Sequence, residues 1–158
     1  MKAKTLLQIV TFIVAAEIIG ITGSVFTISS IPTWYASLNK PSFNPPNWIF
    51  GPVWTILYAT LGLSAYLIWK KGWVNKDVKI TLGIFALQFI VNLKWTFLFF
   101  GLHSTLLGLI AIAILWVLIV LTIIKFYQLS KPAGLLMIPY LLWVSFATLL
   151  NFYIWKLN

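Results

Sequence analysis

The sequence predicts an all-α integral membrane protein, built as a five-transmembrane-helix bundle. The chain of 158 residues is 61% hydrophobic and 8% charged, whereas soluble domains average roughly 45–50% and 25%. Such a chain cannot cover itself with polar surface, so a soluble globular domain is excluded. Intrinsic disorder is also excluded because it requires low hydrophobicity.

Five apolar runs are each long enough to cross a hydrocarbon core, which takes about 20 helical residues. Their unbroken hydrophobicity favours helices over a barrel, whose strands alternate in segments of about ten residues. We expect a single membrane domain over residues 1–158, with spans at about residues 5–30, 47–69, 80–102, 104–124 and 133–155.

The first run resembles a signal peptide at its start, but no Ala-x-Ala cleavage site follows it and Glu17 lies within it. We therefore expect it to be kept as a span. An outside loop over residues 31–46 joins it to the second run. Because this loop contains Pro32, Pro41, Pro45 and Pro46, whose rings restrict the backbone, we expect an ordered lid.

The last three runs are joined by short connections around residues 101–103 and 130–132. Short connections make neighbouring helices antiparallel, and they predict a compact bundle.

The lysines predict the orientation. Eight of them lie on one side of the expected membrane: Lys2, Lys4, Lys70, Lys71, Lys76, Lys79, Lys125 and Lys131. The other side has Lys40 and Lys156. The positive-inside rule therefore places the N-terminus in the cytoplasm and the C-terminus outside. These charges are too scattered to form a phosphate-binding face, so no nucleic acid partner is expected.

Standard catalytic groups are scarce. The chain has no Cys, a single histidine at His103, and only Glu17 and Asp77 as acids. No metal site, catalytic triad or carboxylate pair can be assembled from these residues, and no cofactor is expected. We interpret His103 as a surface loop residue.

Aromatic residues make up 17% of the chain. Some lie near span ends and are explained as interface anchors, namely Trp48, Trp69, Trp73 and Trp155. Others recur at helical spacing on one face of a span: Trp54, Tyr58 and Leu61; Gln88, Asn92, Trp95 and Phe99; and Tyr140, Trp143, Ala147 and Leu150. These stripes fit either helix packing, with the amides as hydrogen-bonding groups, or an aromatic-lined cavity. Trp116 is expected to face lipid or to pack.

Glu17 and Lys94 are ionisable residues inside spans, where they are usually paired or functional. Both lie roughly 20–22 Å along their helices from the cytoplasmic end. One hypothesis is an ion pair, within one chain or across a dimer, and the alternative for Lys94 is snorkelling to the outer interface. Two small-residue patches, Gly20-x-x-x-Ser24 and Gly83 with Ala86, allow close helix approach.

The chain resembles the TspO/MBR family, the translocator proteins also called peripheral-type benzodiazepine receptors. The most specific segment is WYASLNKPSFNPPNWIFGPVWTILYATLG, residues 34–62, which is similar to the family's first-loop and second-helix signature. Further matches are Gly23-Ser24, the third-span residues Gln88 to Gly101, and PYLLWVSFATLLNFYIW at residues 139–155. The matches run in the family's order along nearly the whole chain.

The resemblance implies a five-helix bundle, commonly a homodimer, that binds porphyrin, haem-like or sterol-like ligands in a pocket beneath the first loop. The implied function is that of a membrane receptor or transporter. The pocket residues that it implies are Trp34, Tyr35, Trp54, Tyr58, Asn92, Trp95, Trp143, Phe146, Ala147 and Leu150. A loose sterol-contact pattern falls on Leu150, Tyr153 and Lys156.

An alternative function is enzyme-like, light-dependent oxidative degradation of protoporphyrin, in which Trp54 and Trp143 would take part. A third reading is a structural membrane protein whose aromatic residues only pack. The chain also departs from the family, since Ala111 stands where many members have an acid and Leu107 where some have an aromatic residue.

Overall fold

The computed structural model describes residues 3–158, so Lys2, one of the lysines that predict the orientation, lies outside the described residues. Over this range the chain is helical and forms no strand, which confirms the all-α prediction. The elements are α1 (Ala3–Ser30), η1 (Ile31–Tyr35), η2 (Asn47–Ile49), α2 (Phe50–Trp69), α3 (Lys76–Thr96), η3 (Phe97–Gly101), α4 (Thr105–Leu129), α5 (Lys131–Leu136) and α6 (Ile138–Leu157).

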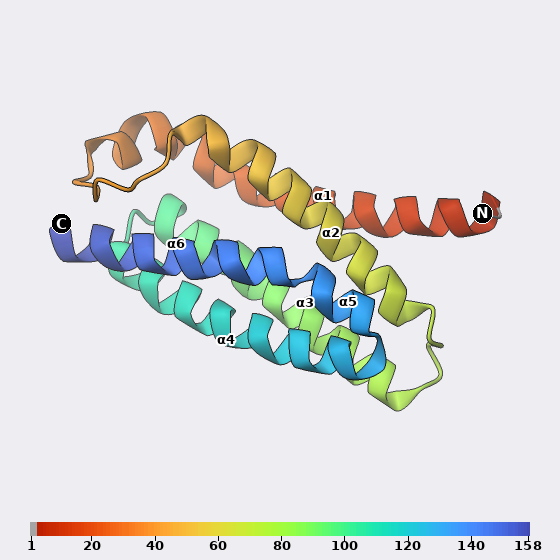
Figure 1. The fold of residues 1–158 in the computed structure, drawn as a ribbon. Coiled ribbons are helices and arrows are strands. Elements are labelled where there is room, and N and C mark those ends of the chain that lie inside the picture. Colours follow the sequence, from red (N-terminus) through yellow and green to blue (C-terminus); the bar gives the residue numbers. More distant parts are fainter. Residues whose placement is uncertain (1–2) are drawn as a thin grey trace.

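Within residues 3–158, five helical stretches are long and apolar enough to cross a membrane, as expected for a five-helix bundle. They are Ala3–Tyr35, Asn47–Trp69, Lys76–Gly101, Thr105–Leu129 and Lys131–Leu157. Helices α1 and α2 lie against each other, α4 packs on both α3 and α6, and the described chain ends lie at opposite ends of the bundle (Figure 1).

Small residues allow α1 and α2 to approach closely. At Gly62 of α2, an added Cβ would lie 2.6 Å from both the Cα of Ile13 and the carbonyl oxygen of Phe12. At Gly20 of α1, it would overlap the ring of Tyr58. Of the Gly20-x-x-x-Ser24 patch, Gly20 is therefore used within the chain, at the α1–α2 contact.

Two spans end in π-turns, and one of these turns extends past the end that the sequence predicts. The segment expected to be a loop from residue 31 is helical at its beginning, because η1 continues α1 through Tyr35. Pro32 lacks an N–H and cannot donate to the preceding turn, and the helix widens there instead of ending. The other π-turn, η3, continues α3 to Gly101, within the span expected over residues 80–102, and it buries Phe99 and Phe100.

The fifth span is interrupted. A turn at Met137 separates α5 from α6, and Pro139 follows in the first turn of α6. Proline is accepted in a first helical turn but not inside a helix, because it removes a backbone donor and clashes with the preceding turn. The interruption therefore follows from Pro139.

Helix caps begin the third and fourth spans. The Asn75 side chain accepts a hydrogen bond from the backbone N–H of Asp77 at 2.8 Å, and Ser104 accepts from Leu107 at 3.3 Å. Each cap provides a partner for a backbone donor that the first helical turn leaves free.

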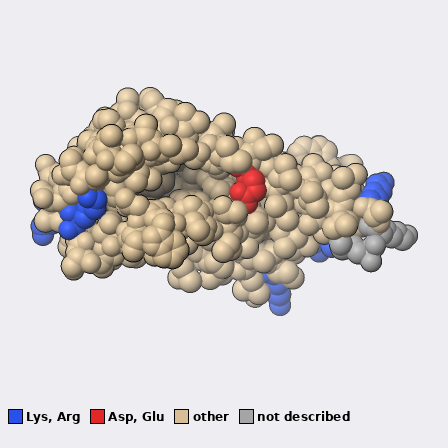
Figure 2. Space-filling view, turned by 90° about the horizontal axis from the view of Figure 1, so that it is seen from above, with Lys and Arg blue, Asp and Glu red and all other residues tan. Residues whose placement is uncertain are grey.

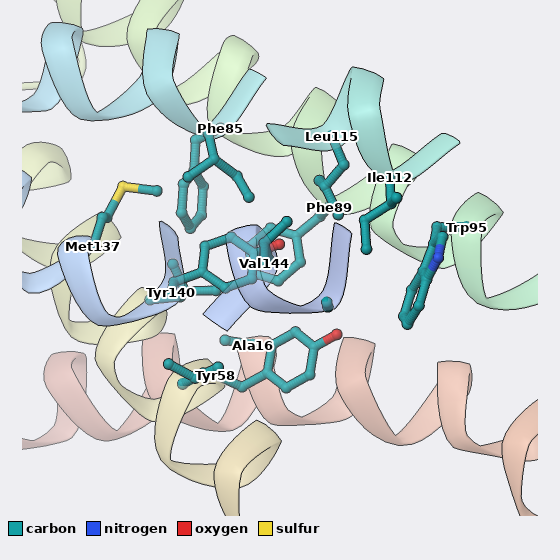
Figure 3. Close-up of a cluster of buried hydrophobic side chains, with 14 of the residues drawn as sticks. Ala16, Tyr58, Phe85, Phe89, Trp95, Ile112, Leu115, Met137, Tyr140 and Val144 are labelled. Carbon is teal, nitrogen blue, oxygen red and sulfur yellow. The ribbon is translucent and has the colours of Figure 1, made fainter. Parts of the chain in front are cut away.

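The packed core lies between α3, α4 and α6, and α2 faces it (Figure 3). Phe85 and Phe89 of α3 lie there with Tyr140 of α6, which is fully buried, and with Leu115 of α4. Because most of the outward side chains of α4 are apolar and exposed, the bundle presents to the bilayer the surface that its composition predicts.

Glu17 and Lys94 do not pair within the chain. Lys94 is exposed on α3, whereas Glu17 is half-buried and lines the cavity described below. The hypothesis of an ion pair inside one chain is therefore wrong. Exposure leaves the long lysine side chain free to reach the outer interface, as the alternative of snorkelling requires.

Of the expected interface anchors, Trp48, Trp73 and Trp155 are exposed, whereas Trp69 is half-buried and packs against the rings of Phe12 and Tyr66. Trp116 was expected either to face lipid or to pack, and its side chain is both exposed and in contact with another helix. It is 38% exposed, and its indole Nε1 donates to Ser145 Oγ on α6 at 2.8 Å.

Candidate ligand-binding site

A cavity of about 360 Å³ lies between α1, α2, α3 and α6, in the half of the bundle that contains the loop and the described C-terminus. Its size falls in the range of roughly 300–1,000 Å³ found for small-molecule sites. Figure 2 shows it as a hollow in the molecular surface, with one acidic side chain at its edge. Glu17 is the acid among the lining residues.

The walls follow helical spacing. On α1 the lining residues include Glu17, Gly20, Ser24 and Thr27, which lie on one helix face. Both π-turns also reach the cavity, since Tyr35 of η1 and Phe99 of η3 line it.

Most of the expected pocket residues lie together around this cavity: Tyr35, Trp54, Tyr58, Asn92, Trp95, Trp143, Ala147 and Leu150. Trp34 and Phe146 do not line it. Each is the chain neighbour of a lining residue, and successive helical residues point in different directions. Trp34 instead stacks on the His103 ring at 4.8 Å, and Phe146 lies beside Phe43 and Trp143.

His103 is an exposed loop residue, as expected, and has a positive φ of 54°. Its Nε2 lies 3.4 Å from Ser30 Oγ, which donates to the Phe100 carbonyl at 2.7 Å. These contacts hold η3 against the end of α1.

Aromatic rings form much of the cavity wall. The Trp54 ring lies 5.5 Å from that of Tyr58, in a stacked arrangement, and 6.3 Å from that of Trp95. The Trp95 ring in turn stacks on Phe99 at 6.2 Å. Faces of this kind suit a flat apolar molecule.

A buried hydrogen-bond network crosses the bundle at Asn92. The Tyr58 hydroxyl donates to Asn92 Oδ1 at 3.0 Å, and Asn92 Nδ2 donates to the Tyr140 hydroxyl at 2.9 Å. One amide thereby connects α2, α3 and α6, and it lies at the cavity wall. Both earlier interpretations of this stripe, packing and cavity lining, therefore apply to Asn92.

Gln88 behaves differently, although it lies one turn away on the same stripe. It is fully buried, it does not line the cavity, and neither of its amide atoms has a hydrogen-bond partner among the described residues. Trp143 lines the cavity, and its Nε1 is also buried without a partner there.

The sequence reasoning missed Asn151. Its Oδ1 accepts a hydrogen bond from Trp95 Nε1 at 3.2 Å, and its Nδ2 donates to the Ala147 carbonyl at 2.8 Å. A polar residue in an apolar span, one turn after Ala147, was the signal that could have found it.

The largest omission is the α1 wall. No residue of α1 was among those expected in the pocket, yet this helix contributes Glu17, Gly20, Gly23, Ser24 and Thr27. Small and polar residues carry no aromatic signal, so only the packing of the helices shows that this face borders the cavity.

The sterol-contact pattern is divided between two environments. Leu150 is buried and lines the cavity, whereas Tyr153 and Lys156 are exposed. The Tyr153 ring packs against Phe43 of the loop at 5.4 Å. The three residues therefore do not form one surface of the cavity.

The loop is tied to the described C-terminus. Asn39 donates from its backbone N–H to Asn158 Oδ1 at 3.0 Å, and Asn158 Nδ2 donates to the Asn39 carbonyl, also at 3.0 Å. Closer to the cavity, the Tyr35 hydroxyl donates to Asn44 Oδ1 at 2.6 Å. These bonds hold the loop in place over the end of the bundle.

Among residues 3–158, no three His, Asp or Glu side chains come close enough to hold a metal ion. The cavity offers instead aromatic faces, amides, hydroxyls and one carboxylate. Membrane-spanning helices that surround such a cavity define the class of the molecule, a multi-pass integral membrane protein with an aromatic cavity that opens at its surface (Figure 2).

The chain belongs to the TspO/MBR family, whose profile matches residues 12–156. It is 47% identical over 154 residues to the tryptophan-rich protein TspO of Archaeoglobus fulgidus, covering 97% of this chain and 98% of that protein. It is 47% identical over 140 residues to the tryptophan-rich protein TspO of Chlorobaculum tepidum, covering 89% of each chain. The human translocator protein is 38% identical over 138 residues, covering 86% of this chain and 81% of that protein.

Proposed function

We propose that the protein is a receptor or transporter that binds a planar hydrophobic ligand, of the porphyrin or other tetrapyrrole class, in the cavity. The observation that carries the proposal is the aromatic wall formed by Trp54, Tyr58, Trp95 and Phe99. The resemblance to the family supports tetrapyrroles as the ligand class. Sterol-like molecules are a less favoured class, because only Leu150 of the sterol-contact pattern lines the cavity.

The proposed binding follows from the geometry. Ring faces would stack on the flat ligand, and the amides of Asn92 and Asn151 would be its polar neighbours. The buried Trp143 Nε1, which has no partner among the described residues, is a hydrogen-bond donor available to a ligand acceptor. The loop would act as a lid that limits access from the membrane surface.

Titration of the detergent-solubilised protein with protoporphyrin should quench tryptophan fluorescence in a saturable manner. Trp54→Phe and Trp143→Phe should each weaken binding about 2- to 10-fold, because phenylalanine presents a smaller ring face and lacks the indole N–H, and an aromatic contact or a hydrogen bond contributes about 0.5–1.5 kcal/mol. Trp116→Phe is the matched control, since Trp116 lies outside the cavity. Quenching that does not saturate, or equal affinity in all variants, would contradict the proposal.

A second candidate function is light-dependent oxidative breakdown of bound protoporphyrin. The supporting observation is that Trp54 and Trp143 both line the cavity, where they could meet a bound ring. Absorption spectra and mass analysis after illumination in air test this candidate. Recovery of unaltered porphyrin from saturated wild-type protein would reject it without affecting the binding proposal.

We further propose that the N-terminus is cytoplasmic and that the protein forms homodimers. The lysine distribution supports the orientation, and the open space around Gly83 on α3 supports close approach of a second copy. Because the chain has no Cys, a single cysteine can be placed at Lys4 or at Lys156 and treated with a membrane-impermeant label from one side at a time. The cysteine at Lys4 should react from the cytoplasmic side and the cysteine at Lys156 from the outside. A cysteine at Gly83 reports pairing by disulfide cross-linking, and an exclusively monomeric product would argue against this dimer.

A further inference from the structure

The carboxylate of Glu17 has no role in the proposed binding of an apolar ring. Glu17 is half-buried in α1 and borders the cavity, and Figure 2 shows the acidic group at the edge of the hollow. The other acid of the sequence, Asp77, lies at the start of α3, outside this cavity. An acid within a membrane span is a functional candidate by default, because an unpaired charge there is unfavourable.

Glu17 marks the inner end of the cavity, away from the loop. It is the first lining residue along α1, Tyr58 is the last along α2, and Asn92 is the first along α3. Because α2 runs antiparallel to the other two helices, these three residues lie at the same end. The contact of Gly20 with the Tyr58 ring, one helical turn after Glu17, brings α1 and α2 together there.

The polar groups at this end are already paired with one another, and none of them pairs with Glu17. Tyr58 directs its hydroxyl to Asn92, and Asn92 directs its amide to Tyr140. Lys94 is exposed, and because it follows Asn92 by two residues it points about 200° around α3 from the amide stripe. Among the described residues, no side chain therefore provides a donor for the Glu17 carboxylate.

We propose that Glu17 contributes to the ligand specificity of the cavity, by favouring, among flat hydrophobic molecules with the same ring, those that have a basic amine. This inference rests on the proposed function, namely that the cavity takes a ligand. A protonated amine at the inner end would donate charge-assisted hydrogen bonds to the carboxylate. The same carboxylate repels anions, so acidic groups of a ligand would lie toward the loop.

The test compares two probes with the same ring, 9-(aminomethyl)anthracene and 9-anthracenemethanol. Both are titrated into the detergent-solubilised full chain, and saturable quenching of tryptophan fluorescence gives the two dissociation constants. The ratio of these constants is then compared between wild type and Glu17→Gln. This comparison cancels the partitioning of each probe into detergent, because the partitioning is the same for both proteins.

The wild type should prefer the amine, and Glu17→Gln should reduce that preference about tenfold, as expected when a charge-assisted hydrogen bond is lost. Glu17→Asp, which keeps the carboxylate, should retain part of the preference. Asp77→Asn, which removes the acid outside the cavity, should leave it unchanged. Helical circular dichroism shows whether each variant is folded, and Glu17→Ala replaces Glu17→Gln if the latter is not.

An equal preference ratio in wild type and Glu17→Gln would overturn the inference. If the alcohol still binds saturably in that case, the cavity remains a ligand site and the proposed function stands. If neither probe nor protoporphyrin binds saturably to the wild type, the amine inference and the proposed function both fail.

Discussion

Gly62→Ala is expected to destabilise the bundle markedly, although it adds a single methyl group. The new Cβ would lie 2.6 Å from the backbone of both Phe12 and Ile13, and backbone atoms cannot rotate away as a flexible side chain can. Overpacking of this kind typically lowers the free energy of unfolding by about 1–3 kcal/mol. We expect α1 to be displaced from α2, because this contact holds the N-terminal helix.

The thermal unfolding midpoint in detergent, followed by circular dichroism, measures this effect. Gly51→Ala, in the same helix, is the matched control, because a Cβ there meets nothing within 4 Å. In the control, alanine should raise stability by about 0.5–1 kcal/mol through its higher helix propensity. Equal midpoints for the two variants would show that α1 and α2 are not in close contact at Gly62.

Two amide side chains lie one turn apart on α3, and we expect their removal to change the stability of the protein in opposite directions. Asn92→Leu leaves the hydroxyls of Tyr58 and Tyr140 without their shared partner. A buried polar group without a partner costs about 1–3 kcal/mol. Asn92→Leu should therefore lower the unfolding midpoint, and it should weaken ligand binding because Asn92 lines the cavity.

Gln88→Met should instead keep or raise the stability. Gln88 is fully buried, and its amide atoms have no partner among the described residues. Methionine has a similar shape and removes the penalty for a buried unsatisfied amide, about 1–3 kcal/mol. Equal destabilisation by Gln88→Met and Asn92→Leu would contradict the difference between the two environments.

A double-mutant cycle separates the network from simple loss of volume. Asn92→Leu should be less damaging in a Tyr58→Phe background, where one of the two hydroxyls is already absent. Additive effects of the two substitutions would show that their hydrogen bond contributes nothing to stability.

Much of the aromatic part of the site could be predicted because its signal is periodic. Trp54 and Tyr58, or Asn92 and Trp95, are spaced so that one helix face must present them together. The family resemblance added Tyr35, which lies on a π-turn outside the expected spans. It also added Trp34 and Phe146, whose neighbours line the cavity while they do not.

The α1 wall could not be predicted in this way. Glu17, Gly20 and Ser24 are small or isolated polar residues, and nothing in their spacing separates a cavity face from a helix contact. The sequence also does not show which of Gln88 and Asn92 has hydrogen-bond partners, because both are amides on the same helix face. Only the positions of Tyr58 and Tyr140 on other helices decide which amide is paired.

The sequence by itself determined the membrane class, the five spans and the aromatic faces. The reason is that hydrocarbon requires long apolar helices and helical spacing groups residues on a face. The tertiary structure alone decided which faces meet, because contacts between helices depend on residues far apart in the chain. It placed α1 at the cavity wall, left the side chain of Lys94 exposed on the surface of α3, and placed Glu17 at the end of an aromatic site.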